Sequence, residues 1–393
     1  MKKIVVLGAG YASLAFLKNL DLEALGDYEI FLISRYDYHY TSILLHEVVT
    51  GARRDARIYL TDILPHKIKI IQDEVLEIKE DKVLAKKQSY DYDYLVVGLG
   101  FQSDSFGIAG IKEYATPIVD FENALKLREK IYLQIEKYKK TKDCKDLKFV
   151  VCGGGFSGIE TITSLAINLK KFCKEQGVDS TLLQFICIEA MPDILPMFSA
   201  KLVQKTKNFL KTENVELATG CKILRCEEGR VIVQRNDREE AIEAGLIIWT
   251  AGVKGNAVIE NSSFFTSARS KVEVDAYLRP YNQENQDKMQ NIYIIGDCAA
   301  LKDAESGRFY PPTAQIAIKQ GEYLAKAFKN RILGVGVEAF NYISEGTVCS
   351  LGEECAIGNV KGRDISGKIA IFIKRMIEKK WLYKILGIRG IFR

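Results

Sequence analysis

Residues 4–13 read IVVLGAGYAS, and residues 149–158 repeat the pattern as FVVCGGGFSG. In each stretch a β-branched run leads through closely spaced glycines into a helical pattern. Glycine lets the backbone turn tightly and approach a pyrophosphate, whose negative charge then lies on the free N–H groups of the following helix. One such turn is weak evidence, because tight strand-to-helix turns use the same residues without a ligand. Two in one chain predict two dinucleotide sites, which favours electron transfer.

The acid that follows the second turn indicates which nucleotide binds there. The strand at residues 182–188 ends in Glu189, whose carboxylate can accept hydrogen bonds from both ribose hydroxyls and would repel a 2′-phosphate. We therefore expect NADH rather than NADPH at the second turn. The residues assigned to this site are Gly153, Gly155, Gly158 and Glu189.

The first turn departs further from the usual pattern. The strand at residues 28–33 is followed by Ser34 and Arg35, with no carboxylate, and Ser13 stands where a third glycine is common. Arg35 suits a phosphate contact or stacking on an adenine ring, and it suits a solvated loop equally well. These residues alone leave the first nucleotide open.

Length and composition predict an ordinary globular protein. With 393 residues, 47% of them hydrophobic, the chain can form two or three domains. Residues 1–3 lead directly into the first strand without a secretory signal, so we expect a cytoplasmic protein. The nine cysteines include no CxxC pair and none before Cys144, which fits reduced thiols. The three histidines, His39, His46 and His66, lack metal-ligand spacing, and we expect no metal site.

The C-terminal segment carries the positive charge of the chain. Residues 367–393 hold eight basic side chains and one acidic one, a net +7, so the rest of a chain of net charge +5 sums to −2. Apolar residues recur there at steps of three and four, which is typical of a helix lying in a membrane interface, and charges interrupt it too often for a spanning helix. A helix docked on its own core or in a dimer interface is the alternative, and nucleic-acid binding fits the tryptophan and isoleucines less well. The predicted apolar stripe comprises Ile373, Ile377, Trp381, Ile385, Ile388 and Phe392.

Between and beyond the two turns, strands and helices alternate. Short strands begin at residues 68–75, a polar helix is predicted over 121–140, and the apolar strand at 245–252 mirrors the segment 95–100. A further strand ends in Gly296-Asp297. An aspartate there can accept from a ribityl hydroxyl, with a helix cap as the alternative.

The chain resembles the type II NADH:quinone oxidoreductases, single-subunit flavoproteins of the two-dinucleotide disulfide-reductase superfamily. The resemblance covers nearly the whole chain. It rests on residues 7–12 (LGAGYA), 38–40 (YHY), 153–160 (GGGFSGIE), 249–253 (WTAGV), 295–298 (IGDC), 313–317 (TAQIA), 346–352 (GTVCSLG) and the basic tail. It implies non-covalent FAD at the first turn, NADH at the second, and a quinone that enters from the membrane.

The expected fold is α/β, with two Rossmann-like dinucleotide-binding domains and a C-terminal amphipathic membrane-anchoring region. Residues 1–115 and 251–340 are expected to form the FAD-binding domain. Residues 116–250 are expected to form the NADH-binding domain, and residues 341–393 the membrane-associating region. We expect the protein on the cytoplasmic face of the cell membrane, where the tail is also compatible with a homodimer.

Position by position, the resemblance also implies roles for single residues. Gln315 and Gln320 resemble the glutamine pair that lines the quinone site, whereas Lys319 stands where another glutamine is common. The residues implied for FAD are Gly8, Ala9, Gly10, Tyr11 and Ala12 at the pyrophosphate, Ser34, Arg35 and Val75 at the adenosine, Asp297 at the ribityl and phosphate region, and Ala314 and Lys374 beside the isoalloxazine.

Glu160 lies in the first turn of the helix after the second glycine turn. A carboxylate there gains from the helix dipole whether or not it takes part in a reaction. The resemblance implies a catalytic role, in which Glu160 lies between flavin and nicotinamide and positions NADH or passes a proton towards the quinone. Burial would raise the pKa of such a carboxylate. The implied activity is FAD-dependent oxidation of NADH and two-electron reduction of a membrane quinone, menaquinone or ubiquinone, without proton pumping.

Three alternatives stay open. A sulfide:quinone oxidoreductase needs a cysteine pair beside the flavin, and Cys349 and Cys355 are close in sequence, but Glu189 favours a nicotinamide site. A soluble NADH:ferredoxin-type reductase keeps both nucleotide sites but gives the tail no role. A membrane-recruited dinucleotide sensor would bind both nucleotides without quinone turnover.

Overall fold

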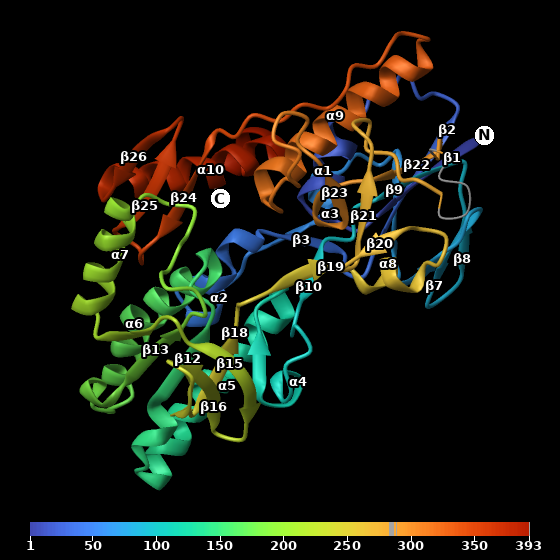
Figure 1. The fold of residues 1–393 in the computed structure, drawn as a ribbon. Coiled ribbons are helices and arrows are strands. Elements are labelled where there is room, and N and C mark those ends of the chain that lie inside the picture. The colour runs from blue at the N-terminus through green and yellow to red at the C-terminus, as the bar shows by residue number, and fades with distance from the viewer. Residues whose placement is uncertain (283–286, 288, 393) are drawn as a thin grey trace.

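The computed structural model describes residues 1–282, 287 and 289–392, within which two parallel five-stranded sheets form the centres of two α/β units (Figure 1). The first sheet has the order β22-β9-β1-β2-β5. Residues 4–7 of its central strand are almost fully buried. A parallel strand that is covered on both faces has to be continuously apolar, and this explains the run Ile4-Val5-Val6-Leu7. The strands are β1 (Lys2–Leu7), β2 (Tyr28–Ser34), β5 (Ile68–Gln72), β9 (Tyr94–Val97) and β22 (Ile292–Ile294).

The second sheet has the order β11-β18-β12-β13-β14. It explains why residues 245–252 mirror residues 95–100, since β18 and β9 each pair with the strand that precedes a glycine turn. The expected α/β class with two related units is confirmed, whereas the exact domain boundaries stay a prediction. The strands are β11 (Ala115–Pro117), β12 (Lys148–Cys152), β13 (Gln184–Ile188), β14 (Val215–Ala218) and β18 (Leu246–Trp249), and the longer helices of this unit are α5 (Phe121–Thr141), α6 (Phe156–Glu175) and α7 (Ala200–Thr212).

The first glycine turn joins β1 to α1 (Tyr11–Asn19) and packs against the end of β9. Gly8 has φ +85°, and a Cβ atom on it would lie 2.5 Å from the Gly98 carbonyl oxygen. Ser13 fits in place of the third glycine because its partner is itself a glycine: a Cβ atom on Gly98 would lie 2.2 Å from Ser13 Oγ. The departure from the usual pattern therefore leaves the close approach of helix and strand intact.

Short antiparallel pairs and small sheets surround the two units. β10 pairs with β19, so the two crossings between the units lie side by side. The pairs and sheets are β3 (Tyr38–Tyr40) with β4 (Arg57–Tyr59), β6 (Val75–Ile78) with β7 (Lys82–Ala85) and β8 (Ser89–Asp91), β10 (Phe101–Ser103) with β19 (Val253–Gly255), β15 (Lys222–Glu227) with β16 (Arg230–Arg235) and β17 (Arg238–Glu243), and β20 (Ser267–Ala268) with β21 (Lys271–Val274) and β23 (Ala299–Leu301). The short helices are α2 (Leu45–Thr50), α3 (Leu60–Ile63), α4 (Ile111–Tyr114) and α8 (Ala257–Asn261).

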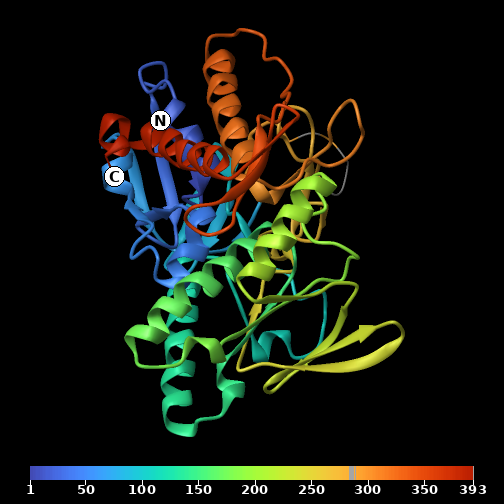
Figure 2. The ribbon, with the colours of Figure 1, turned by 90° about the vertical axis from the view of Figure 1, so that its left-hand side faces the viewer.

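The C-terminal part folds back onto the first unit. After α9 (Ala314–Ile332), which packs along α1, the antiparallel sheet of β24 (Gly346–Ser350), β25 (Ala356–Val360) and β26 (Arg363–Ser366) leads into α10 (Lys368–Leu386). Figure 2 shows α10, in red, lying across the blue first unit, where it contacts α1 and α3. The described part of the chain contains no helix with the length and apolarity that a bilayer crossing requires.

The predicted single apolar stripe of the tail is wrong in detail. Trp381 and Ile385 pack into the core of the first unit, whereas Ile388 and Phe392 lie beyond the end of α10 and are exposed. The reason is that α10 stops at Leu386, so the three- and four-residue steps do not continue on one helix. Of the predicted stripe, Ile377 is exposed on α10, together with four apolar side chains outside the stripe: Ile369, Phe372, Met376 and Tyr383.

Candidate active site

A cavity of about 980 Å³ lies where the first unit, the second unit and the C-terminal part meet. The first glycine turn forms one end of its wall, the start of α6 forms another part, and β24 and α10 close it from the C-terminal side. Carboxyl ends of β1, β2 and β9 face this cavity, which is where parallel α/β sheets bind ligands.

The structure brings most of the predicted site residues to this one cavity. Glu160, Gln315 and every residue implied for FAD contribute to its lining. Gln320 does not: its side chain is buried, and its Oε1 accepts a hydrogen bond of 2.7 Å from the Gly296 backbone N–H. Gln320 therefore holds the turn that carries Asp297, and its contact with a quinone stays a prediction.

Asp297 has a buried oxygen atom at the cavity wall, its Oδ1, which has no hydrogen-bond partner among the described residues. Burial raises the pKa of this carboxyl above its ordinary range, although Lys271 opposes the effect. A buried oxygen without a partner is costly, and a ribityl hydroxyl would supply the missing donor. Together with the glycine cradle at Gly8, this orphaned atom fits FAD.

The end of the cavity where adenosine is predicted contains a carboxylate that the sequence pattern did not reveal. Arg35 pairs with Glu74 at 2.9 Å, and both line the cavity. Glu74 follows β5, the strand next to β2, so a carboxylate lies beside the end of β2 although β2 itself is followed by Arg35. Parallel pairing of the two strands was the signal that would have found it.

The second glycine turn contributes Phe156 and Ser157 to this cavity, whereas its glycines and Glu189 are not among the lining residues. At the end of β13, Glu189 accepts hydrogen bonds from the backbone N–H of Gly154 at 2.6 Å and of Met191 at 2.8 Å. Gly158 packs so tightly that a Cβ atom on it would lie 1.8 Å from the Gly153 carbonyl oxygen. The carboxylate is thus held at the turn, and the roles of Gly153, Gly155, Gly158 and Glu189 towards NADH stay predictions.

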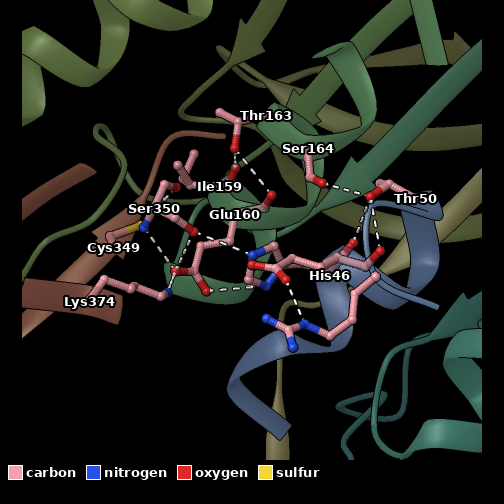
Figure 3. A network of polar contacts seen from close by, with 11 residues as sticks. His46, Thr50, Ile159, Glu160, Thr163, Ser164, Cys349, Ser350 and Lys374 are labelled. Carbon is pink, nitrogen blue, oxygen red and sulfur yellow. Dashed lines mark hydrogen bonds and ion pairs between the residues drawn. The ribbon is translucent and has the colours of Figure 1, made fainter. Parts of the chain in front are cut away.

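Glu160 is the centre of a buried polar network made by four elements (Figure 3). Its side chain, on α6, forms an ion pair with Lys374 of α10. Its Oε1 also accepts from the backbone N–H and the hydroxyl of Ser350 in β24, at 2.9 and 3.0 Å. His46 of α2 approaches Oε2 with its Nδ1 at 3.7 Å. The residue is only 7% exposed.

The pKa of Glu160 is lowered in this network, whereas the sequence led us to expect a raised one. Burial does raise the pKa of Glu160, but the charge of Lys374 and the hydrogen bonds from Lys374 and the Ser350 N–H oppose this effect, and the pKa lies below its ordinary value. Burial lowers the pKa of Lys374, yet Glu160 more than compensates and the pKa is raised. Burial lowers the pKa of His46, so its ring is neutral at pH 7. Glu160 and Lys374 therefore form an ionised pair.

The whole chain matches proteins of known family. Residues 2–321 match the pyridine nucleotide-disulphide oxidoreductase family. A type II NADH:quinone oxidoreductase of Staphylococcus haemolyticus is 40% identical over 400 residues, which cover 100% of this chain and 98% of the relative. The Staphylococcus aureus protein of that name is 37% identical over 402 residues, with the same coverage.

The chain belongs to the type II NADH:quinone oxidoreductases. Its fold agrees with solved structures. NDH2 from Plasmodium falciparum in complex with NADH has a TM-score of 0.89 at 19% identity and covers 100% of this chain and 96% of its own. The sulfide:quinone oxidoreductase of Aquifex aeolicus has a TM-score of 0.79 at 21% identity, with 100% and 93% covered. Membership confirms the predicted family and an oxidoreductase function.

Proposed function

We propose that this type II NADH:quinone oxidoreductase oxidises NADH and reduces a membrane quinone, with FAD held non-covalently in the large cavity. The observation that carries the proposal is that the first glycine turn, Asp297 and the Glu160–Lys374 pair line this one cavity. A bound FAD supplies the redox chemistry, because it can take electrons from NADH and pass them to a quinone. The protein supplies binding, orientation and charge.

The first unit would hold the flavin nucleotide. Backbone N–H groups at the start of α1 offer a positive helix terminus to the pyrophosphate, next to Gly8 and Gly10. Asp297 Oδ1 would accept from a ribityl hydroxyl, which removes the cost of its buried, unpaired state. Glu74, held by Arg35, would accept from a ribose hydroxyl at the adenosine end.

In the Glu160–Lys374 pair, the proton that the two groups could share is held by Lys374. Since Glu160 has a lowered pKa and Lys374 a raised one, the pair rests as carboxylate and ammonium. Quinone reduction consumes two protons. The Lys374 ammonium, oriented by Glu160 at the cavity wall, would give one of them and be reprotonated from solvent, which would also supply the other. Glu160 would thus act as the residue that positions the proton donor.

The C-terminal part would place the cavity at the membrane surface. Exposed Ile369, Phe372 and Met376 lie on α10 within a segment of net charge +7, a combination suited to the interface of an anionic bilayer. Gln315 lines the cavity, and its Oε1 accepts from Tyr342 and from the Glu345 N–H. Lys319 pairs with Glu322 and Glu345 and lies outside the cavity lining, so it does not replace a cavity glutamine. We place the protein on the cytoplasmic face of the membrane.

A sulfide:quinone oxidoreductase is the second candidate that shares the fold. All nine cysteines are free, and none of them is among the described residues that line the cavity. Cys349 is fully buried, and burial raises the pKa of its thiol far above the ordinary value, which suppresses the thiolate. The proposal is tested with purified protein and quinone-containing liposomes. NADH must disappear in step with quinone, whereas quinone reduction by sulfide but not by NADH would reverse the assignment.

A further inference from the structure

His39 lies between the first glycine turn and the C-terminal helix. The Trp381 indole Nε1–H donates to His39 Nε2 at 3.1 Å, and His39 Nδ1 lies 2.9 Å from the carbonyl oxygen of Ala9. An indole N–H can only donate, so Nε2 must be the unprotonated nitrogen. The hydrogen of the neutral ring is therefore on Nδ1, which donates to Ala9. Trp381, His39 and Ala9 form one directed chain of hydrogen bonds.

The side chains of this hydrogen-bonded series are buried, and His39 also lines the cavity. His39 is 1% exposed and Trp381 is 4% exposed. The Tyr11 ring covers both, with centroid distances of 5.1 Å to His39 and 4.9 Å to Trp381. Burial lowers the pKa of His39 to about 4, which keeps the ring neutral at physiological pH. If one of these groups loses its hydrogen-bond partner at so buried a position, the loss costs free energy because water does not readily replace the partner.

The chain of hydrogen bonds ends at the backbone of the predicted phosphate cradle. In a planar trans peptide the carbonyl and the next N–H point in opposite directions. A carbonyl of Ala9 held by His39 therefore directs the N–H of Gly10 away from His39, and Gly10 lines the cavity. α10 is thus connected to the cavity wall at two places. Lys374 pairs with Glu160, and Trp381 is linked to the glycine turn through His39.

We propose that Trp381 is a positioning residue that couples docking of α10 to flavin binding through His39 and Ala9. The docked helix holds the glycine turn in its phosphate-binding geometry, and by reciprocity a bound flavin strengthens the docking of α10. The inference rests on the proposed function in one respect, that the cavity takes FAD. It assigns to the C-terminal helix a role inside the protein that is separate from contact with a membrane.

The test uses the FAD-loaded protein in detergent and follows the rise in fluorescence as FAD is released after dilution. Trp381→Phe keeps an aromatic ring but removes the N–H, and we expect release about five to ten times faster, the effect of one buried hydrogen bond. His39→Asn keeps a side-chain amide N–H that can donate to Ala9, but its shorter side chain places no acceptor at the position of Nε2, so the bond from Trp381 is lost. We expect a similar acceleration, and no further one when both changes are combined.

A matched control separates this coupling from a general loosening of the helix. Arg375 of α10 donates to the Glu353 carbonyl oxygen at 3.1 Å on the surface, so Arg375→Gln also removes a bond of α10 without touching the glycine turn. It should leave FAD release unchanged. Amide hydrogen exchange over residues 368–386 gives a second readout: saturating FAD should slow exchange in the unsubstituted protein and less so in Trp381→Phe.

The outcomes keep the two proposals apart. Wild-type FAD release from Trp381→Phe, or exchange in α10 that is insensitive to FAD, would overturn the coupling and leave the proposed function intact. Equal acceleration by Arg375→Gln would also overturn it, because any weakening of α10 would then suffice. A purified protein that binds no FAD would instead remove the proposed function on which the coupling rests.

Discussion

Lys374 of α10 forms an ion pair with Glu160 of α6, although 214 residues separate them in the sequence. The pair joins the C-terminal helix to the helix that starts at the second glycine turn, at the wall of the large cavity. The side chains of Lys374 and Glu160 are only 12% and 9% exposed, so each depends on the other to remain charged. The same ion pair therefore joins α10 to α6 at the cavity wall and places two opposite charges there.

Removing one member of this pair should cost more than removing both. Lys374→Met leaves the Glu160 carboxylate buried without its cation, which should lower the free energy of unfolding by about 3–5 kcal/mol. Lys374→Met combined with Glu160→Gln should recover most of that loss. Urea unfolding of the FAD-loaded proteins at pH 7 measures both, and equal stabilities of the single and double variants would contradict an ionised pair.

The buried, neutral His39 predicts a loss of stability in mild acid. Its folded pKa of about 4 lies below the ordinary value of 6.5, so the unfolded chain binds the proton more readily between these values. The contribution of His39 is therefore complete above about pH 6.5 and is lost as the pH falls towards 4. At about 1.4 kcal/mol per pKa unit, the loss amounts to roughly 3 kcal/mol. Unfolding of His39→Asn, which cannot titrate, should lack this slope; parallel pH profiles would refute it.

Glu189 should decide between NADH and NADPH. Glu189→Arg removes the carboxylate that would repel a 2′-phosphate, so we expect the KM for NADH to rise about tenfold and activity with NADPH to increase. Because Glu189 also holds the Gly154 and Met191 N–H groups, Glu189→Gln is the appropriate control for the turn. Steady-state rates with both nucleotides test this, and an unchanged preference would remove Glu189 from the ribose site.

The exposed face of α10 should bind anionic liposomes. Ile369, Phe372 and Met376 can be replaced by serine together without disturbing the core, because all three are largely exposed. We expect at least a tenfold weaker partition into the membrane fraction, with an unchanged melting temperature. Deletion of the tail is a poorer test, since it removes the buried Trp381. If the triple variant floated with liposomes as the unsubstituted protein does, this face of α10 would not be the membrane-binding surface.

The fold could be predicted because its strongest signals are local. β-branched runs before glycine turns placed β1, β12 and the helices after them, and the predicted helix over 121–140 is α5. The prediction for the tail was wrong because its apolar pattern extends beyond the end of the helix. α10 ends at Leu386, and Trp381 is buried by tertiary packing. Ser13 in place of glycine could not be interpreted from one segment, because its compensating partner is Gly98 on β9.

The candidate site was predictable residue by residue but not as a network. Family resemblance named Glu160 and Lys374 separately, and their contact depends on how α10 docks. The expected rise in the pKa of Glu160 failed for the same reason, since burial was foreseen and the nearby cation was not. Ser350 lies in the segment 346–352 and Trp381 in the basic tail, but neither residue was assigned a contact, because their bonds to Glu160 and His39 depend on tertiary packing.

Anaerobic stopped-flow spectroscopy of the purified protein tests the central claim most directly. The proposed function predicts that NADH bleaches the flavin absorbance, and that a menaquinone or ubiquinone analogue mixed in afterwards restores it fully. Glu160→Gln should bind FAD and slow the second phase more than the first. A flavin that NADH leaves unbleached while sulfide bleaches it, or a bleached flavin that no quinone restores, would contradict the claim.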